Sequence, residues 1–271
     1  MRRKIALVQM TSKDNVEENL NTALDFINQA AQRNTLVVAF PENFLFMGPE
    51  SKYLDVAQDI DGEFVRTFQE QAKKFKIAVL MGSFLERNPL DHKKCFNTSV
   101  LIDKNGEILA SYRKIHLFDV QLPSVQLLES KTISPGNQVA ICDSDFGRVG
   151  LSVCYDLRFP LLYQNLTRKG AQIIFVPSAF TMQTGKFHWI ALLKARAIEN
   201  QVYIAAPAQY GAHNSKRTSF GSTVLIDPWG DIRLIAEEGE GVFFGEIDLE
   251  YLNKVRTNMP VLSHRVEGMD Y

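Results

Sequence analysis

The stretch TLVVAFPE at residues 35–42 is an apolar run that ends at a proline and is followed by Glu42. A second stretch, VGLSVCYDLRFP at residues 149–160, likewise begins with an apolar run, which is followed by Cys154 and later by a proline. Continuous apolar runs of this kind are typical of strands that are covered on both faces. Together they predict an α/β layered fold in which polar side chains follow buried strands.

Strand-like and helix-like patterns alternate along the rest of the chain, without a linker, a tandem repeat or a low-complexity segment. Apolar runs predict further strands at residues 4–10, 77–83, 96–103, 107–114, 138–143, 171–176, 202–206, 222–226 and 241–247. Helical periodicity predicts helices at residues 16–33, 63–76, 161–169, 186–200 and 249–256. We therefore expect a single domain over residues 1–271, with an extended tail from about residue 257.

Composition and charge narrow the class of protein. Of the 271 residues, 45% are hydrophobic and 23% are charged, which is typical of a globular domain. The formal net charge of −1 predicts no general attraction to nucleic acid or to an anionic membrane. No apolar run reaches the roughly 18 residues that a membrane span needs, and the basic start lacks the apolar length of a signal peptide. With three scattered cysteines, we expect a reducing, cytoplasmic location.

Cys154 and Glu42 each follow a buried strand, where ligands gather in α/β sheets. A thiol at the turn from a strand into a helix lies near backbone N–H groups that favour a thiolate. A carboxylate in apolar surroundings has a raised pKa, as a general base near neutral pH requires. Taken alone, either residue has another interpretation: Cys154 as a buried structural cysteine, and Glu42 as a surface glutamate.

Lys114 and Glu129 are further candidates. Lys114 ends a predicted strand, and its ammonium group could stabilise a tetrahedral oxyanion. Glu129 follows an apolar pair and could orient that lysine or assist a base. Taken alone, a solvated lysine at a strand end is the simpler interpretation of Lys114.

Other kinds of site have weaker support. The sequence contains no HExxH motif, no paired CxxC motif, no GxGxxG loop and no Walker loop. The five histidines lack the spacing of metal ligands, and neither His116 nor His188 lies in a recognisable protease motif. We therefore expect no metal site.

Three segments together resemble the nitrilase superfamily of carbon–nitrogen hydrolases. They are FPEN at residues 40–43, YRKIHL at residues 112–117 and GLSVCYDLRFP at residues 150–160. The resemblance covers nearly the whole chain. It implies a four-layer α-β-β-α sandwich, with Glu42 as general base, Lys114 as oxyanion stabiliser and Cys154 as nucleophile. Glu129 matches an additional glutamate that is often found beside these three.

Further segments resemble one branch of that superfamily, whose members act on deaminated glutathione or on 2-oxoglutaramate. Both substrates would leave a 2-oxoglutaryl group on Cys154. The resemblance implies a small-molecule amide substrate, no cofactor, and a homodimer or higher even oligomer. The residues expected around the substrate are Tyr155, Arg158, Phe180, Thr184 and Arg217.

Arginine binds carboxylates in a bidentate manner, so a 2-oxo acid predicts basic residues at the site. Besides Arg158 and Arg217, the candidates are Lys186, Arg196 and Lys216. Arg196 has another interpretation, because Glu199 lies three residues later on the same predicted helix and could pair with it.

Two other functions remain open from the sequence. One is an amidase of the same chemistry with a different short-chain substrate. The other is a catalytically inactive scaffold that keeps the fold for binding a partner.

Overall fold

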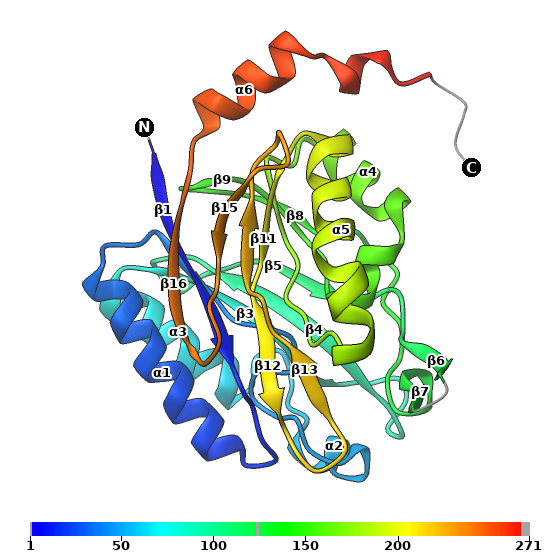
Figure 1. Cartoon of the computed structure of the whole chain (residues 1–271). Helices are drawn as coiled ribbons and strands as arrows, with labels where there is room; N and C mark the ends of the chain where they lie inside the picture. Colours follow the sequence, from blue (N-terminus) through cyan, green and yellow to red (C-terminus); the bar gives the residue numbers. More distant parts are fainter. Residues whose placement is uncertain (1, 123–124, 267–271) are drawn as a thin grey trace.

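The computed structural model describes residues 2–122 and 125–266 and contains two large β-sheets stacked face to face. Figure 1 shows these sheets between two groups of helices, α1 and α3 on one side and α4 and α5 on the other. The expected α/β class and four-layer α-β-β-α arrangement are confirmed.

The first sheet has eight strands, in the order β13-β12-β1-β2-β3-β4-β5, with β16 also paired to β1. Its strands are β1 (Arg3–Met10), β2 (Val37–Ala39), β3 (Ala78–Arg87), β4 (Cys95–Ile102), β5 (Ile108–Arg113), β12 (Ala208–Ala212), β13 (Thr218–Phe220) and β16 (Gly241–Ile247). The central strands β1, β2 and β3 are parallel, so their carboxyl ends meet at one edge of the sheet.

The second sheet has six strands, in the order β15-β14-β11-β10-β9-β8. They are β8 (Ile141–Ser144), β9 (Gly147–Leu151), β10 (Ile173–Phe175), β11 (Tyr203–Ala206), β14 (Val224–Ile226) and β15 (Ile232–Ile235). A separate two-stranded hairpin consists of β6 (Asp119–Leu122) and β7 (Val125–Leu128). The parallel strands β9, β10 and β11 again bring their carboxyl ends together.

The α-helices are α1 (Val16–Gln32), α2 (Tyr53–Val56), α3 (Glu63–Phe75), α4 (Pro160–Arg168), α5 (Met182–Asn200) and α6 (Leu249–Asn258). Short 3-10 helices are η1 (Glu50–Lys52), η2 (Glu129–Lys131), η3 (Cys154–Arg158) and η4 (Val261–His264). The side chain of Asn15 caps α1 by accepting hydrogen bonds from the backbone N–H groups of Glu17 and Glu18.

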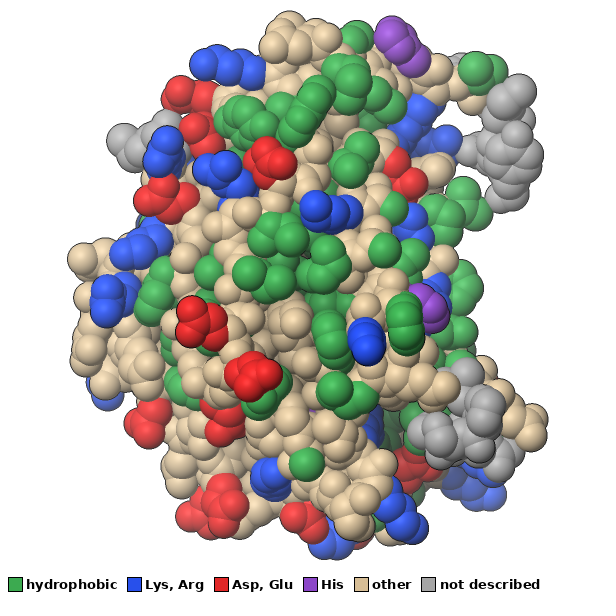
Figure 2. Space-filling view, viewed as in Figure 1, with side chains coloured by type: hydrophobic (Ala, Val, Ile, Leu, Met, Phe, Trp, Pro, Cys, Tyr) green, Lys and Arg blue, Asp and Glu red, His purple; other side chains and the backbone are tan. Residues whose placement is uncertain are grey.

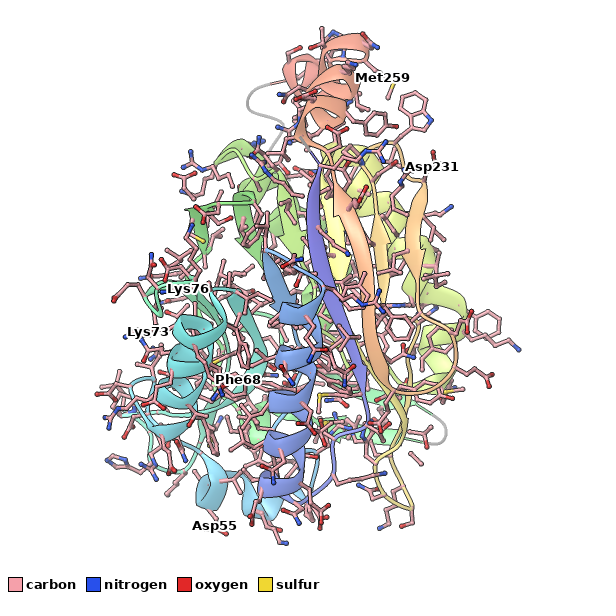
Figure 3. All side chains as sticks on the ribbon, turned by 90° about the vertical axis from the view of Figure 1, so that its left-hand side faces the viewer. Asp55, Phe68, Lys73, Lys76, Asp231 and Met259 are labelled. Carbon is pink, nitrogen blue, oxygen red and sulfur yellow. The ribbon has the colours of Figure 1, made fainter. Side chains whose placement is uncertain are left out.

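The core has two main apolar layers, and alternate residues of the first sheet contribute to each. In β1, Ile5 and Leu7 pack between the two sheets, whereas Ala6 and Val8 pack under α1 and α3. Figure 3 shows α1 and α3 side by side over this outer face, with Phe68 labelled on α3. Both faces of these strands are covered, as the continuous apolar runs predict.

Some elements differ from expectation. The sequence pattern did not predict the hairpin β6–β7 or the strands β12, β13 and β15, and each of these strands has at most five residues. Helix α5 begins at Met182, four residues earlier than expected, because Thr181 caps it by accepting a hydrogen bond from the backbone of Thr184. The segment from residue 257 is not simply extended: it includes the end of α6 and then η4, while residues 267–271 lie outside the described part.

Surface charge is mixed, in line with the net charge. On the face seen in Figure 2, lysine and arginine side chains are interspersed with aspartate and glutamate. Among the described residues, no helix combines the length and the apolar character that a membrane span requires.

Candidate active site

One cavity of about 810 Å³ is lined by the four residues expected in catalysis and the five expected around the substrate. It opens where strand ends of both sheets converge, so side chains from distant segments face the same space. The nine lining residues are Glu42, Lys114, Glu129, Cys154, Tyr155, Arg158, Phe180, Thr184 and Arg217.

Glu42 follows β2, and the neighbouring strand β3 approaches its backbone very closely. A Cβ atom on Gly82 would lie 2.0 Å from the carbonyl oxygen of Phe40 and 2.1 Å from that of Pro41, so only glycine fits there. The Glu42 side chain is almost fully buried, and its Oε2 accepts a hydrogen bond of 3.0 Å from the backbone N–H of Ala179, which follows β10. The carboxylate is therefore held between the two sheets.

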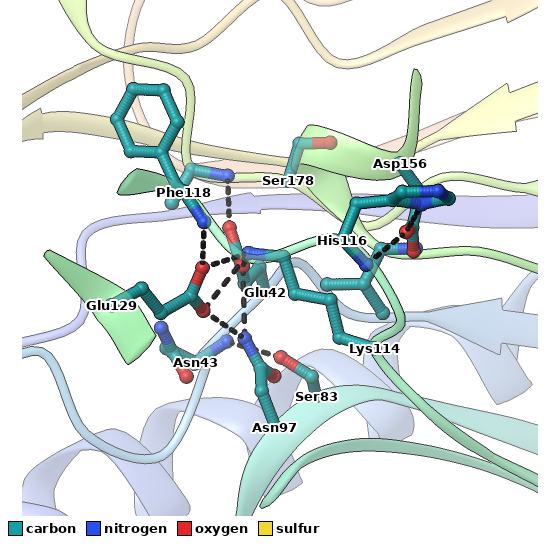
Figure 4. A network of polar contacts seen from close by, with 12 residues as sticks. Glu42, Asn43, Ser83, Asn97, Lys114, His116, Phe118, Glu129, Asp156 and Ser178 are labelled. Atoms are coloured by element: carbon teal, nitrogen blue, oxygen red, sulfur yellow. Dashed lines mark hydrogen bonds and ion pairs between the residues drawn. The ribbon is translucent and has the colours of Figure 1, made fainter. Parts of the chain in front are cut away.

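Lys114 follows β5 and lies between two carboxylates, as Figure 4 shows. Its Nζ is 3.0 Å from Glu42 Oε1 and 2.8 Å from Glu129 Oε2. Glu129 in turn accepts a hydrogen bond of 2.6 Å from the backbone N–H of Phe118. The solvated interpretation of Lys114 is wrong, because its side chain is only 2% exposed.

Asn97, on β4, belongs to the same network, although the sequence did not single it out. Its Nδ2 donates to Glu42 Oε1 over 3.0 Å and to Glu129 Oε1 over 3.4 Å. A polar side chain inside a buried strand needs hydrogen-bond partners, and this requirement was the available signal. Asn97 thus links the two glutamates from a third strand.

Cys154 is the first residue of η3 and has a left-handed backbone conformation, with φ of 47°. For a non-glycine residue this geometry is strained, and strain of this kind is often found at functional turns. The backbone N–H of Cys154 donates to the carbonyl of Pro177 over 3.0 Å, which ties the turn to the end of β10. The thiol is thereby directed into the cavity.

Asp156 links the turn at Cys154 to the segment that carries Lys114. This fully buried carboxylate accepts hydrogen bonds from the Tyr112 hydroxyl over 2.7 Å and from the backbone N–H of Val153 over 2.9 Å. It also contacts the backbone N–H and the ring Nδ1 of His116, at 3.0 Å and 2.7 Å. The sequence analysis did not identify this role, which depends on two segments far apart in the chain.

The pKa values of Glu42 and Cys154 are shifted in opposite directions. Burial raises the pKa of Glu42, but the ammonium of Lys114 and hydrogen bonds from Cys154 and Lys114 outweigh it and hold this pKa below its ordinary value. Burial and the Glu42 carboxylate raise the pKa of the Cys154 thiol well above its ordinary value. The expectation of a raised pKa for Glu42 is wrong, because the charge of Lys114 stabilises the carboxylate. At Cys154, burial and the Glu42 carboxylate outweigh the thiolate-favouring effect of backbone N–H groups.

Lys114 stays protonated despite its burial. Burial lowers the pKa of this amine, but the carboxylates of Glu129 and Glu42 raise it well above its ordinary value. The site therefore contains a fixed cation beside a thiol and a carboxylate, an arrangement that suits acyl transfer through an oxyanion.

The two candidate arginines have few protein partners. The guanidinium of Arg158 lies over the rings of Tyr155 and Phe180, and its NH1 is 3.2 Å from His188 Nδ1. Arg217 interacts with the hydroxyl of Tyr53. Within residues 2–122 and 125–266, neither arginine forms an ion pair with a carboxylate, so both retain donors for an anionic ligand.

The other basic candidates divide into two groups. Lys216 lines the cavity as an exposed side chain, whereas Lys186 and Arg196 do not line it. Arg196 NH1 is 2.9 Å from Glu199 Oε1, which confirms the pairing interpretation. Its Nε also donates to the carbonyl of Leu157 over 3.0 Å.

Thr184 and Phe180 line the cavity from the start of α5 and from the segment just before it. The Thr184 hydroxyl is 3.0 Å from that of Thr181, so it takes part in capping this helix. Phe180 is buried against Trp189, with ring centroids 4.8 Å apart. Both residues thus have a structural contact besides their place at the cavity.

Metal ligands do not gather in the part of the chain that the structure describes, which contains no group of three or more His, Cys, Asp or Glu side chains able to hold an ion. Cys95 and Cys142 lie in β4 and β8, and burial raises the pKa of each thiol to about 11.

The family model described as carbon–nitrogen hydrolase matches residues 4–257. The chain belongs to the carbon–nitrogen hydrolase family. It is therefore an enzyme that hydrolyses carbon–nitrogen bonds of amides, and its fold and its relatives agree with membership of the nitrilase superfamily.

Three relatives illustrate the similarity. The deaminated glutathione amidase of Synechocystis is 44% identical over 264 residues, which cover 96% of this chain and 97% of that protein. The crystal structure of the NitFhit protein of Caenorhabditis elegans has a TM-score of 0.93 and 41% identity, with 97% of this chain and 65% of that one covered. The structure of Saccharomyces cerevisiae Nit3, a member of branch 10 of the nitrilase superfamily, has a TM-score of 0.87 and 32% identity, covering 96% and 94%.

Proposed function

We propose that this enzyme is a thiol amidase in which Cys154 forms an acyl-enzyme. The observation that carries the proposal is the Lys114 ammonium held between the carboxylates of Glu42 and Glu129, in the cavity that Cys154 also lines. A nucleophile, a base and a fixed cation are the parts that a covalent amide hydrolysis needs.

In the first half-reaction, Glu42 takes the thiol proton as the sulfur of Cys154 attacks the amide carbonyl carbon. The tetrahedral intermediate collapses as Glu42 passes the proton to the departing nitrogen, leaving a thioester and a free amine. In the second half-reaction, Glu42 takes a proton from water, and the resulting hydroxide attacks the thioester. Collapse of this intermediate releases the acid and returns the proton to sulfur.

The oxyanion of both intermediates would lie between the Lys114 ammonium and the backbone N–H of Tyr155. Tyr155 is the second residue of η3, and the first N–H groups of a helix have no partner within the helix. Glu129 would hold Lys114 in place and keep it charged, because its carboxylate is bonded to the Lys114 amine and to the Phe118 backbone. The chemistry proposed here uses no cofactor and no metal ion.

We propose deaminated glutathione as the substrate, cleaved to 2-oxoglutarate and cysteinylglycine. Two observations support this choice: the similarity to proteins of that name, and two cavity arginines, Arg158 and Arg217, that form no ion pair with a carboxylate of the described residues. The second candidate is omega-amidase activity on 2-oxoglutaramate, which would give the same acyl group but release ammonia. Tyr155, Phe180 and Thr184 would contribute to the walls around the acyl group.

A side-by-side rate measurement tests this proposal. The enzyme is supplied with deaminated glutathione or with 2-oxoglutaramate, and 2-oxoglutarate release is followed with and without EDTA. We expect the higher kcat/KM on deaminated glutathione and no effect of the chelator. Higher kcat/KM on 2-oxoglutaramate would favour omega-amidase, and a loss of rate with EDTA would contradict the metal-free chemistry.

Intact mass distinguishes an enzyme from an inactive scaffold. Substrate mixed with the enzyme and quenched in acid should add the mass of a 2-oxoglutaryl group, and the Cys154→Ala variant should show no adduct. The absence of both adduct and turnover with every small amide tested would favour the scaffold. We also propose that the enzyme is a homodimer or a higher even oligomer, which analytical ultracentrifugation tests. We propose a cytoplasmic location, which cell fractionation tests.

A further inference from the structure

We propose that Arg217 and Tyr53 bind a carboxylate on the leaving group of the substrate, whereas Arg158 faces the acyl portion. This inference rests on the proposed amidase function and deepens it. It predicts that the enzyme prefers amides whose amine product is an amino acid or a peptide with a free carboxyl terminus.

Arg217 comes from a loop that is firmly attached to the rest of the molecule. The loop joins β12 to β13, and the backbone N–H of His213 donates to the carbonyl of Arg217 over 2.9 Å. The ring of buried His213 is 2.8 Å from the Ser12 carbonyl through Nδ1 and 2.8 Å from Ser219 Oγ through Nε2. Asn214 Oδ1 also accepts from the backbone N–H of Arg217 over 2.9 Å. The guanidinium is therefore presented from a fixed backbone.

Arg217 and Tyr53 are two hydrogen-bond donors on the same cavity. Both line the cavity, and Tyr53 is 7% exposed. A tyrosine hydroxyl and a guanidinium can both donate hydrogen bonds to a carboxylate. Arg217 is partly buried, and a buried cation is costly unless a negative group compensates it; no carboxylate among the described residues lies within ion-pair distance of its guanidinium. A ligand carboxylate would satisfy both side chains.

The position of Glu42 indicates which part of the substrate Arg217 meets. The base that takes the thiol proton must also reach the departing nitrogen, so the leaving group lies on the Glu42 side of the cavity. Gln209, on β12, donates from Nε2 to the backbone carbonyl of Glu42 over 3.0 Å, and β12 leads directly into the loop that carries Arg217. Arg217 thus belongs to the side where the leaving group departs.

Arg158 comes from a different element, the short helix η3 that follows β9 of the second sheet. It ends η3, the short helix that begins with Cys154, and its guanidinium is 5.7 Å from the ring centroid of Tyr155 and 5.4 Å from that of Phe180. Because the acyl group becomes attached to Cys154, a cation carried by the same short helix is placed to meet the acyl portion. The cavity then has one cation for each end of a dianionic amide.

Two substrates that differ in one group test this assignment. The first is deaminated glutathione, and the second is the same molecule with its glycine carboxylate converted to an amide. In the parent enzyme we expect kcat/KM to be at least about tenfold higher on the acid, the size of effect that a charged hydrogen bond supports. In Arg217→Gln this ratio should fall to about one through a rise in KM for the acid.

Three further variants test whether the charge of Arg217 itself causes the change in the ratio. Arg217→Lys should restore part of the ratio because it restores the charge, and Tyr53→Phe should lower it by a smaller factor. Lys186→Gln removes an exposed cation of α5 that does not line the cavity and should keep the ratio of the parent enzyme. The combination of a lost ratio in Arg217→Gln, partial rescue by lysine and a normal ratio in Lys186→Gln supports the proposal.

Other outcomes overturn it. Equal losses on the acid and the amide in Arg217→Gln would place Arg217 at the acyl end, and equal rates of the parent enzyme on both would mean that the carboxylate is not recognised. In either case 2-oxoglutarate is still released, so the proposed amidase function stands while the inference fails. If the parent enzyme hydrolyses neither substrate, the amidase function on deaminated glutathione is wrong, and the inference fails with it.

Discussion

The floor of the cavity, formed by Glu42, Lys114, Glu129 and Cys154, differs from its cationic walls at Arg158 and Arg217. On the floor, both oxygens of Glu42 are bonded, and Lys114 contacts two carboxylates. On the walls, the guanidinium groups contact aromatic rings, a histidine and a tyrosine hydroxyl. The reacting groups are thus preorganised before substrate binds, while the recognition groups keep unused donors. We expect floor variants to lower kcat and wall variants to raise KM.

The largest effect is expected on the floor, for Glu42→Gln. The amide cannot take the thiol proton, so kcat/KM should fall by about 10²–10⁴. In the parent enzyme, a lowered pKa keeps Glu42 ionised at mildly acidic pH, and kcat/KM should be level between about pH 5 and 8. It should fall only as pH drops through this lowered pKa, where the stability contributed by the ionised carboxylate is also lost. Steady-state rates across pH measure this, and a loss below tenfold in the variant would contradict the role of Glu42.

A smaller effect is expected for Asp156→Asn, which acts on the floor through its support. An amide offers one acceptor oxygen where Asp156 now contacts Tyr112, Val153 and His116. Displacing Lys114 relative to Cys154 should lower kcat by about 10–100-fold, with less change in KM. Steady-state kinetics of Tyr112→Phe, which removes one donor only, provide the matched comparison and should show a smaller loss. If Asp156→Asn lowers the melting temperature but leaves kcat unchanged, Asp156 contributes to folding and does not position the site.

On the walls, Arg158→Met should raise KM by about tenfold on deaminated glutathione, with kcat changed by less. The ratio between the acid and its amide should stay as in the parent enzyme, in contrast to Arg217→Gln. Initial rates at varied substrate concentration measure both quantities. A fall in kcat at constant KM would instead mean that Arg158 acts with the reacting groups of the floor and not in substrate binding.

The smallest kinetic effect is expected for Arg196→Met, outside the cavity. Its ion pair with Glu199 and its bond to the Leu157 carbonyl would be lost, which should lower the free energy of unfolding by about 1–3 kcal/mol. KM should stay within about twofold of the parent value. Denaturant unfolding and steady-state kinetics test the two parts, and a large rise in KM would return Arg196 to the substrate-binding residues.

Some residues of the candidate site could be predicted from the sequence, and others could not. The ends of the buried strands pointed to Glu42 and Cys154, because apolar runs that stop at a polar residue can be read directly from the chain. Arg196 and Glu199 were predictable as a pair because their spacing is local. Asn97 and Asp156 were missed because their partners lie on other strands and on another segment.

The sequence by itself determined the alternation of strands and helices, the covering of β2 and β10 on both faces, and the polar residues that follow buried strands. Only the tertiary structure decided that Glu42 and Lys114 from one sheet meet Cys154 from the other, that Lys114 is buried between two glutamates, and that the pKa of the thiol is raised. The reason is physical: periodicity and turn propensity act over a few neighbouring residues, whereas charge, burial and hydrogen bonding at the site depend on the stacking of two sheets.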